Sequence, residues 1–437
     1  MKKIILLLVL IFNYHNICSQ DFNTYFEDAT LRLDYIFAGD SRATHIYFHQ
    51  SSKIDGWAGR RNKLSEKYLN GNGQIIVKDL QTQNVIYCNS FSTLFQEWQS
   101  EKEATEIKKS FENSYLVPYP KRPVEITITL TDSHNKISAQ FSHIINPKDI
   151  LIKKIRNNLY PYKYILQSGS QSSCVDIAII SEGYTKSEMN KFHSDCIRVV
   201  DALFSHEPFA SMKNKFNVIA VDCPSEDSGP SIPRFDKWAN TSVNTHYDTF
   251  YTDRYLMTSN IWRVYDVLSC IPFEQIIVMV NSKEYGGGGI FNQINVITSD
   301  HYTFKEVLVH EFGHGYGGLG DEYDYGNQAS TMYPTDTEPW EPNLTTLVDF
   351  SHKWADLIPN GTPIPTPPIN FSFNYINQPK SLIKKITQCV GVFEGGGYQS
   401  KGVYRPAQEC RMKVNEVEDF CPVCSRHLIK LTKFYTE

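Results

Sequence analysis

The segment HEFGHGYGGLGDEY, residues 310–323, has two histidines four positions apart with a glutamate between them. Apolar residues at helical spacing in TFKEVLVHEFGH predict that this part of the chain forms a helix. Because residues four apart lie on one face of a helix, about 6 Å from each other, His310 and His314 would direct both imidazoles at the same point. A zinc ion requires this arrangement, and Glu311 would lie close enough to a zinc-bound water to remove its proton.

The residues after the second histidine favour a sharp return of the chain. A catalytic zinc takes three protein ligands and keeps its fourth position for water, so a third ligand must come from beyond the helix. Asp321, seven residues after His314, is the nearest carboxylate that could complete the site. Glycine readily adopts the left-handed conformations that end helices. Four glycines are expected to provide the turn: Gly315, Gly317, Gly318 and Gly320.

Other carboxylates compete for the third ligand position. Glu322 directly follows Asp321 and is expected to form a salt bridge or to support a ligand. Glu338 and Glu341 would serve only if a downstream helix carried them, but two prolines interrupt that segment, residues 335–343. The alternative to a metal site is a solvated helix with exposed histidines, which the neighbouring glycines and carboxylates disfavour.

The motif resembles that of the metzincin zinc endopeptidases, HExxHxxGxx followed by a histidine or aspartate, with Gly317 at the glycine. Position 320, the usual ligand position, is glycine here, and the acidic residue comes one later. This departure resembles the bacterial IgA-peptidase family, whose motif is similar to HEFGHxxxGLxDEY. Other segments resemble that family's catalytic domain (VDIAIISEGYT, CVGVFEGGGYQSKGVYRPAQECRMK and FCPVC) and its N-terminal domain (YCNSFSTLFQEWQS and SYLVPYPKRPVEITI).

The resemblance covers nearly the whole mature chain and implies a fold. An α+β multidomain protein is expected, with an N-terminal antiparallel β-sandwich followed by a metzincin-like α/β domain that has a mixed sheet and the HExxH helix. Metzincins place a methionine beneath the zinc. Met332 and Met412 are the candidates, of which the resemblance favours Met412, although either could simply fill the core. Tyr404, in GVYRP, could donate a hydrogen bond to the oxyanion, although most tyrosines serve packing.

The function implied is that of a secreted zinc-dependent endopeptidase. His310, His314 and Asp321 would hold Zn2+ with a net charge of about +1, because two neutral imidazoles and one carboxylate surround the dication. Glu311 would act as general base on a zinc-activated water and then pass the proton to the leaving amine. The partner would be a protein or peptide substrate, with host immunoglobulin or other gut proteins as candidates.

Two other function classes stay open. A zinc-dependent aminopeptidase or a cell-wall peptide amidase would use the same metal but, for the aminopeptidase, also needs a carboxylate anchor for the free amine. A non-catalytic surface binding protein would use the β-rich domain and carry a structural or decayed metal site, which the intact motif disfavours. A nucleic-acid partner is disfavoured by the formal net charge of −5.

The N-terminus has the features of an export signal. Lys2 and Lys3 precede an apolar run, residues 4–12, that is too short to cross a bilayer. Residues 1–20 are therefore expected to be a signal peptide of a secreted, periplasmic or cell-surface protein. Cys18 could instead carry a lipid anchor, but the residues before it suit a lipoprotein signal poorly.

Removal of Cys18 would leave nine cysteines in an oxidising compartment. Because nine is odd, at least one thiol would stay free or pair between molecules. Cys389, Cys410, Cys421 and Cys424 could bind a structural zinc, since the last two have CxxC spacing. Disulfides or buried thiols are the commoner use of such residues in a secreted chain.

The chain is long enough for two or three domains. Residues 21–166 are expected to form the β-sandwich, with a strand in VEITITL and a hairpin in GQIIVKDLQTQNVIYCNSF. The polar stretch QSGSQSS then starts the catalytic domain, residues 167–437, in which VDIAII, FNVIAVD and QIIVMV alternate with helices near 187–213 and 260–268. GGGGIFNQINVITSD is expected to give a cleft-rim strand, preceded by a glycine loop.

Overall fold

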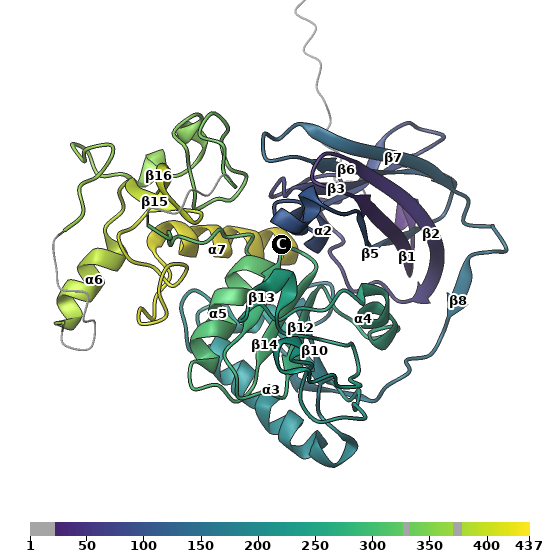
Figure 1. The fold of residues 1–437 in the computed structure, drawn as a ribbon. Helices are drawn as coiled ribbons and strands as arrows, with labels where there is room; N and C mark the ends of the chain where they lie inside the picture. The colour runs from purple at the N-terminus through teal and green to yellow at the C-terminus, as the bar shows by residue number, and fades with distance from the viewer. Residues whose placement is uncertain (1–21, 327–331, 370–377) are drawn as a thin grey trace, which may run out of the picture.

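The computed structural model describes residues 22–326, 332–369 and 378–437 (Figure 1). The expected signal peptide and Cys18 lie outside these ranges. The described chain is a mixture of helices and several sheets, with a β-rich N-terminal region, as the sequence predicts. No helix of the described part is both long and apolar enough to cross a membrane.

The N-terminal region contains two four-stranded sheets. The first has the order β5-β1-β2-β8 and the second the order β4-β3-β6-β7. The strands are β1 (Phe26–Gly39), β2 (Thr44–Asp55), β3 (Gly73–Asp79), β4 (Val85–Phe91), β5 (Lys109–Pro120), β6 (Val124–Thr131), β7 (Ile137–Ile145) and β8 (Lys153–Ile155). Two short helices, α1 (Phe22–Tyr25) and α2 (Leu94–Trp98), accompany them.

Alternating apolar residues pack the two sheets together. Every second residue of β6 is buried, which confirms the strand predicted in VEITITL, and β3 and β4 form the predicted antiparallel hairpin. Ring contacts join the sheets, with Tyr35 against Phe141 at 6.5 Å and Phe91 against Tyr115 at 4.0 Å between ring centroids. One strand departs from the antiparallel expectation, because β8 pairs parallel with β2 where the chain leaves this region.

The second region is built on a six-stranded mixed sheet with the order β13-β14-β12-β10-β11-β9. The four inner strands are parallel and the two outer strands antiparallel. The strands are β9 (Tyr162–Leu166), β10 (Val175–Glu182), β11 (Phe216–Val221), β12 (Gln275–Val280), β13 (Gly287–Ile290) and β14 (Ile294–Thr298). Because β9 belongs to this sheet, the sheet starts a few residues before the polar stretch at 167–173.

Both faces of the mixed sheet are covered, which explains the continuous apolar run of β10. Ile177 and Ile179 pack with helices α3 (Met189–Leu203) and α5 (Phe304–Gly315), whereas Ala178 and Ile180 share a core with α4 (Ile261–Val267) and the N-terminal sheets. The helix predicted over 187–213 is shorter than expected, since α3 ends at Leu203 and Pro208 cannot continue it.

The C-terminal part adds a smaller layer beside the sheet (Figure 1). It contains α6 (Lys380–Gln388), the hairpin of β15 (Phe393–Gly396) and β16 (Gln399–Arg405), and α7 (Pro422–Thr436). The proline-rich segment 359–368 forms no helix or strand, because its prolines can continue neither a helix nor a central strand. Near the end of α7, Phe434 contacts Tyr68 of the N-terminal region.

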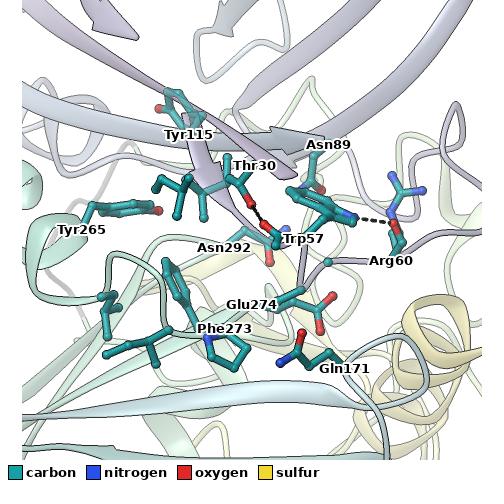
Figure 2. A pocket seen from close by; sticks show the side chains of 18 of the residues that line it. Thr30, Trp57, Arg60, Asn89, Tyr115, Gln171, Tyr265, Phe273, Glu274 and Asn292 are labelled. Atoms are coloured by element: carbon teal, nitrogen blue, oxygen red, sulfur yellow. Dashed lines mark hydrogen bonds between the residues drawn. The ribbon is translucent and has the colours of Figure 1, made fainter. Parts of the chain in front are cut away.

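The two regions share an interface with buried charge. Arg32 of β1 is 2% exposed and donates hydrogen bonds to Asp34 and, within α4, to Asp266 and to the carbonyl of Trp262. A cavity of about 230 Å³ lies at the same interface, between Trp57 and Phe273 (Figure 2). None of residues 304–323 lines this cavity, so it is separate from the histidine motif.

A buried carboxylate at the end of β10 fixes the loop that follows the sheet. Glu182 is fully buried and accepts five hydrogen bonds from residues 241–245. Glu182→Gln would direct an amide group at these donors, so the free energy of unfolding should fall by at least about 2 kcal/mol. Urea denaturation would measure the loss. Glu226→Gln, an exposed neighbour, is the control, and equal stability of the two variants would contradict this role for Glu182.

Candidate metal centre

Helix α5 holds both histidines of the motif on one face. The Nδ1 atom of His310 lies 3.1 Å from the carbonyl oxygen of Arg411, and that of His314 lies 2.6 Å from the carbonyl oxygen of Leu319. A carbonyl only accepts hydrogen bonds, so each Nδ1 carries a proton, and each Nε2 presents a lone pair when its imidazole is neutral. The two Nε2 atoms are 3.0 Å apart.

Asp321 reaches the same point. Its Oδ1 atom lies 3.1 Å from Nε2 of His310 and 3.2 Å from Nε2 of His314. Oδ1 is buried without a hydrogen-bond donor, whereas Oδ2 accepts a 2.5 Å hydrogen bond from Tyr398. Although burial alone would raise the pKa of Asp321, the two histidines hold this pKa well below its usual range.

The three facing atoms fit a metal ion. With both imidazoles neutral, two lone pairs and a carboxylate oxygen would repel one another at these distances unless a cation lay between them. Zinc–nitrogen bonds of about 2.0–2.1 Å in a tetrahedron separate the ligand atoms by roughly 3.3 Å, close to the observed 3.0–3.2 Å. The cluster also attracts positive charge, because Asp321 raises the pKa of His314 to about 9 although burial opposes it.

The turn that returns Asp321 to the histidines depends on glycine in two ways. Helix α5 ends at Gly315, and Gly318 has a left-handed φ of +60° while its amide donates to the carbonyl of His314. The other glycines provide room instead. A Cβ at Gly317 would lie 2.5 Å from the carbonyl oxygen of Gly313, a contact that no side chain tolerates.

Glu311 lies next to the outermost strand of the mixed sheet. Burial raises the pKa of Glu311, and its Cγ would be 3.2 Å from a Cβ at Gly287. A Cβ at Gly289 would lie 2.6 Å from the carbonyl oxygen of Glu311. The prediction of a glycine loop is therefore wrong. Three of these glycines form β13, and their lack of side chains lets α5 approach the strand closely. Tyr255 forms a bridge with Gly287, so part of the edge of β13 is already covered.

The two candidate methionines lie in different surroundings. Met412 is fully buried, and its sulfur would be 2.6 Å from a Cβ at Gly313, between the histidines of α5. The carbonyl of Met412 also accepts a hydrogen bond from the amide of Glu322. Met332 is 37% exposed. The contact with α5 agrees with the preference for Met412.

The tyrosine that contacts the cluster is Tyr398. Its hydroxyl binds Asp321, and its ring stacks on Tyr325 at 5.5 Å. Tyr404 lies on β16, where it pairs with Glu394 and exchanges backbone hydrogen bonds with Thr345. Sequence reasoning missed Tyr398, which is 77 positions from Asp321. Its position directly after three glycines was the available signal.

The competing carboxylates bind elsewhere. Glu338 accepts hydrogen bonds from Thr346 and Asp349, and Glu341 accepts one from Tyr333. Glu322 instead accepts hydrogen bonds from Asn343 and Cys424. Of these acidic residues, Asp321 alone joins the histidines in a group of potential metal ligands within the described residues.

The N-terminal region reaches this site through α2. Glu97 accepts a 2.5 Å hydrogen bond from Tyr255, which bridges to β13. Burial raises the pKa of Glu97 to about 7. Leu69 packs at Gly318, since a Cβ there would lie 2.9 Å from its side chain. Both regions thus border the cluster of His310, His314 and Asp321.

Comparison with known families agrees with this geometry. The model for the family described as IgA peptidase M64 matches residues 164–388 and 378–432, more than half of the chain. The chain belongs to this family. The model described as the peptidase M64 N-terminus matches residues 21–142, the β-rich region of this IgA peptidase family member. No curated protein matches the chain. Membership supports a peptidase that acts on protein substrates.

Proposed function

We propose that this protein is a secreted zinc-dependent endopeptidase. The observation that carries the proposal is the convergence of His310, His314 and Asp321, whose facing atoms lie within 3.0–3.2 Å of one another. Two nitrogen ligands and one oxygen ligand from a protein form a set that suits catalytic zinc and leaves one position open. The match to a peptidase family supports peptide bonds as the substrate.

Zinc, when bound, would polarise the scissile carbonyl and lower the pKa of a coordinated water. Glu311 stands beside the ligands and would accept the proton of the attacking water, then deliver it to the leaving amine. Burial raises the pKa of Glu311, which favours its acceptance of a proton from the water. Tyr398 would orient Asp321, and Tyr404 would donate a hydrogen bond to the oxyanion.

The two regions of the chain would form separate domains. Residues 21–166 would form the N-terminal domain and residues 167–437 the catalytic domain, after removal of a signal peptide at 1–20. Host immunoglobulin and other gut proteins are candidate substrates. The proximity of Glu97 and Leu69 to the site supports a role of the N-terminal domain in shaping the substrate cleft.

An internally quenched peptide library tests the proposal. The protein should cleave internal bonds, lose this activity with 1,10-phenanthroline and regain it with zinc. Cleavage of dipeptides with a free amino terminus, but of no internal bond, would support an aminopeptidase instead. Stoichiometric zinc without cleavage of any peptide would support a surface binding protein.

The hydroxyl of Tyr398 should matter mainly for metal affinity. Tyr398→Phe removes the donor to Asp321, whose carboxylate then loses its fixed orientation, and loss of such a support costs about 10–100-fold in affinity. Competition with a chelator measures the affinity. Tyr325→Phe is the matched control, because its ring stacks on Tyr398 but its hydroxyl binds Arg254. Equal affinity in the two variants would contradict the positioning role.

Tyr404→Phe should act on turnover instead. Removal of one oxyanion donor costs about 10²–10³-fold in kcat, with metal affinity and KM nearly unchanged. Steady-state kinetics on a quenched peptide, at saturating zinc, would measure it. An unchanged kcat would assign Tyr404 to packing on β16.

A further inference from the structure

A second group of potential metal ligands includes Glu322, the residue that follows Asp321. Glu322, Cys410, Cys421 and Cys424 are all fully buried, and their ligand atoms lie within 4.8 Å of one another. The sequence suggested Cys389 as the fourth member, but Cys389 is exposed and outside this group. A carboxylate takes its place.

Distances within the group match a tetrahedral zinc site. Zinc–sulfur bonds of about 2.3 Å separate two thiolates by roughly 3.8 Å. The sulfur atoms of Cys410 and Cys424 are 3.9 Å apart. The sulfur of Cys424 is 3.1 Å from Oε1 of Glu322, somewhat shorter than the roughly 3.5 Å that zinc would impose. A small outward movement of the carboxylate would complete the tetrahedron.

One oxygen of the group lacks a partner. Glu322 is fully buried, and its Oε2 atom has no hydrogen-bond donor. A buried carboxylate oxygen without a partner is costly, so it is normally satisfied by a donor or a cation. Oε1 already contacts Asn343 and Cys424. The carboxylate therefore has an oxygen available for a metal.

The surroundings can balance the charge of three thiolates and a carboxylate. Arg405 and Lys413 lie close enough to interact electrostatically with Glu322. The amide of Cys421 donates to the sulfur of Cys410 at 3.3 Å. Helix α7 begins at Pro422, so its positive N-terminal end faces the sulfur atoms.

We infer that Glu322, Cys410, Cys421 and Cys424 bind a second, structural zinc ion. Four protein ligands leave no position for water or substrate, which distinguishes a structural zinc from a catalytic one. The position of this ion indicates that it would connect segments of the chain near the first site. Glu322 follows Asp321 directly, and its amide binds the carbonyl of Met412. The ion would tie the turn that carries Asp321 to the Met412 segment and to α7.

A disulfide is the competing use of these residues, because an exported chain meets oxidising conditions. Within the described residues all nine cysteines are free thiols. Metal analysis separates the alternatives. Wild-type protein should contain two zinc ions per chain, and His310→Ala/His314→Ala should retain one. X-ray absorption of that variant should show sulfur ligands at about 2.3 Å.

Single cysteine variants identify the ligands. Cys410→Ser should lose one zinc per chain, whereas Cys389→Ser, the exposed control, should keep both. If Cys410→Ser does not fold, the histidine double variant still provides the test. The inference is overturned if that double variant holds no zinc, or if peptide mapping of wild-type protein finds a disulfide between Cys421 and Cys424. Absence of only the histidine-bound zinc would count against the proposed enzyme and not against this site.

Discussion

Glu311→Gln is expected to lower kcat by about 10²–10⁴-fold while the metal content stays unchanged. Glutamine has the shape of glutamate, so helix α5 and its contact with β13 should survive the change. The amide cannot accept and return a proton. Glu311 lies beside the two histidines but is not one of the three proposed metal ligands, so its replacement should leave metal binding intact.

Two measurements together test the role of Glu311. Turnover of a quenched peptide gives the loss of activity, and metal analysis of the same sample shows that the ion is retained. Glu306→Gln is the matched control, because it makes the same charge change in the first turn of the same helix. Retention of wild-type kcat in Glu311→Gln would show that another group accepts the proton. Loss of the metal would make Glu311 a ligand or a structural support.

Local sequence patterns predicted the elements that are determined by burial on one or two faces. The alternation in β6 and the unbroken apolar run of β10 each depend on nearby residues, and both strands appear where expected. The end of α3 depends on Pro208 and on packing that no local pattern describes. The glycine stretch before β14 was misjudged because its reason, the close approach of α5, comes from later in the chain.

The same distinction applies to the site. His310 and His314 are one helical turn apart, so their convergence follows from helix geometry alone. Tyr398 and Met412 reach the site from the C-terminal layer, and only the folded chain brings them to α5. Glu322 shows the limit most clearly. The sequence predicted that it would form a salt bridge or support a ligand, yet it lies in a separate group with three cysteines.

Asp321→Ala is expected to weaken metal binding by more than about 100-fold, because loss of a supporting residue alone costs 10–100-fold and Asp321 is proposed as a direct ligand. The variant also removes the only negative charge among the three converging groups. Activity should fall with metal occupancy and recover in part at high zinc concentration. Titration with a competing chelator, followed by an assay across zinc concentrations, would measure both effects.

A second aspartate, close to Asp321 in the sequence, provides the control for this change. Asp324→Ala removes a carboxylate three positions later that binds the amide of Gly326, and it should leave metal affinity unchanged. If Asp321→Ala keeps wild-type affinity, the third ligand must be another carboxylate. Glu341 would be the first to test, because it is buried and interacts electrostatically with His314. Loss of metal in Glu341→Gln, with retention in Asp321→Ala, would then show that Glu341 and not Asp321 is the third ligand.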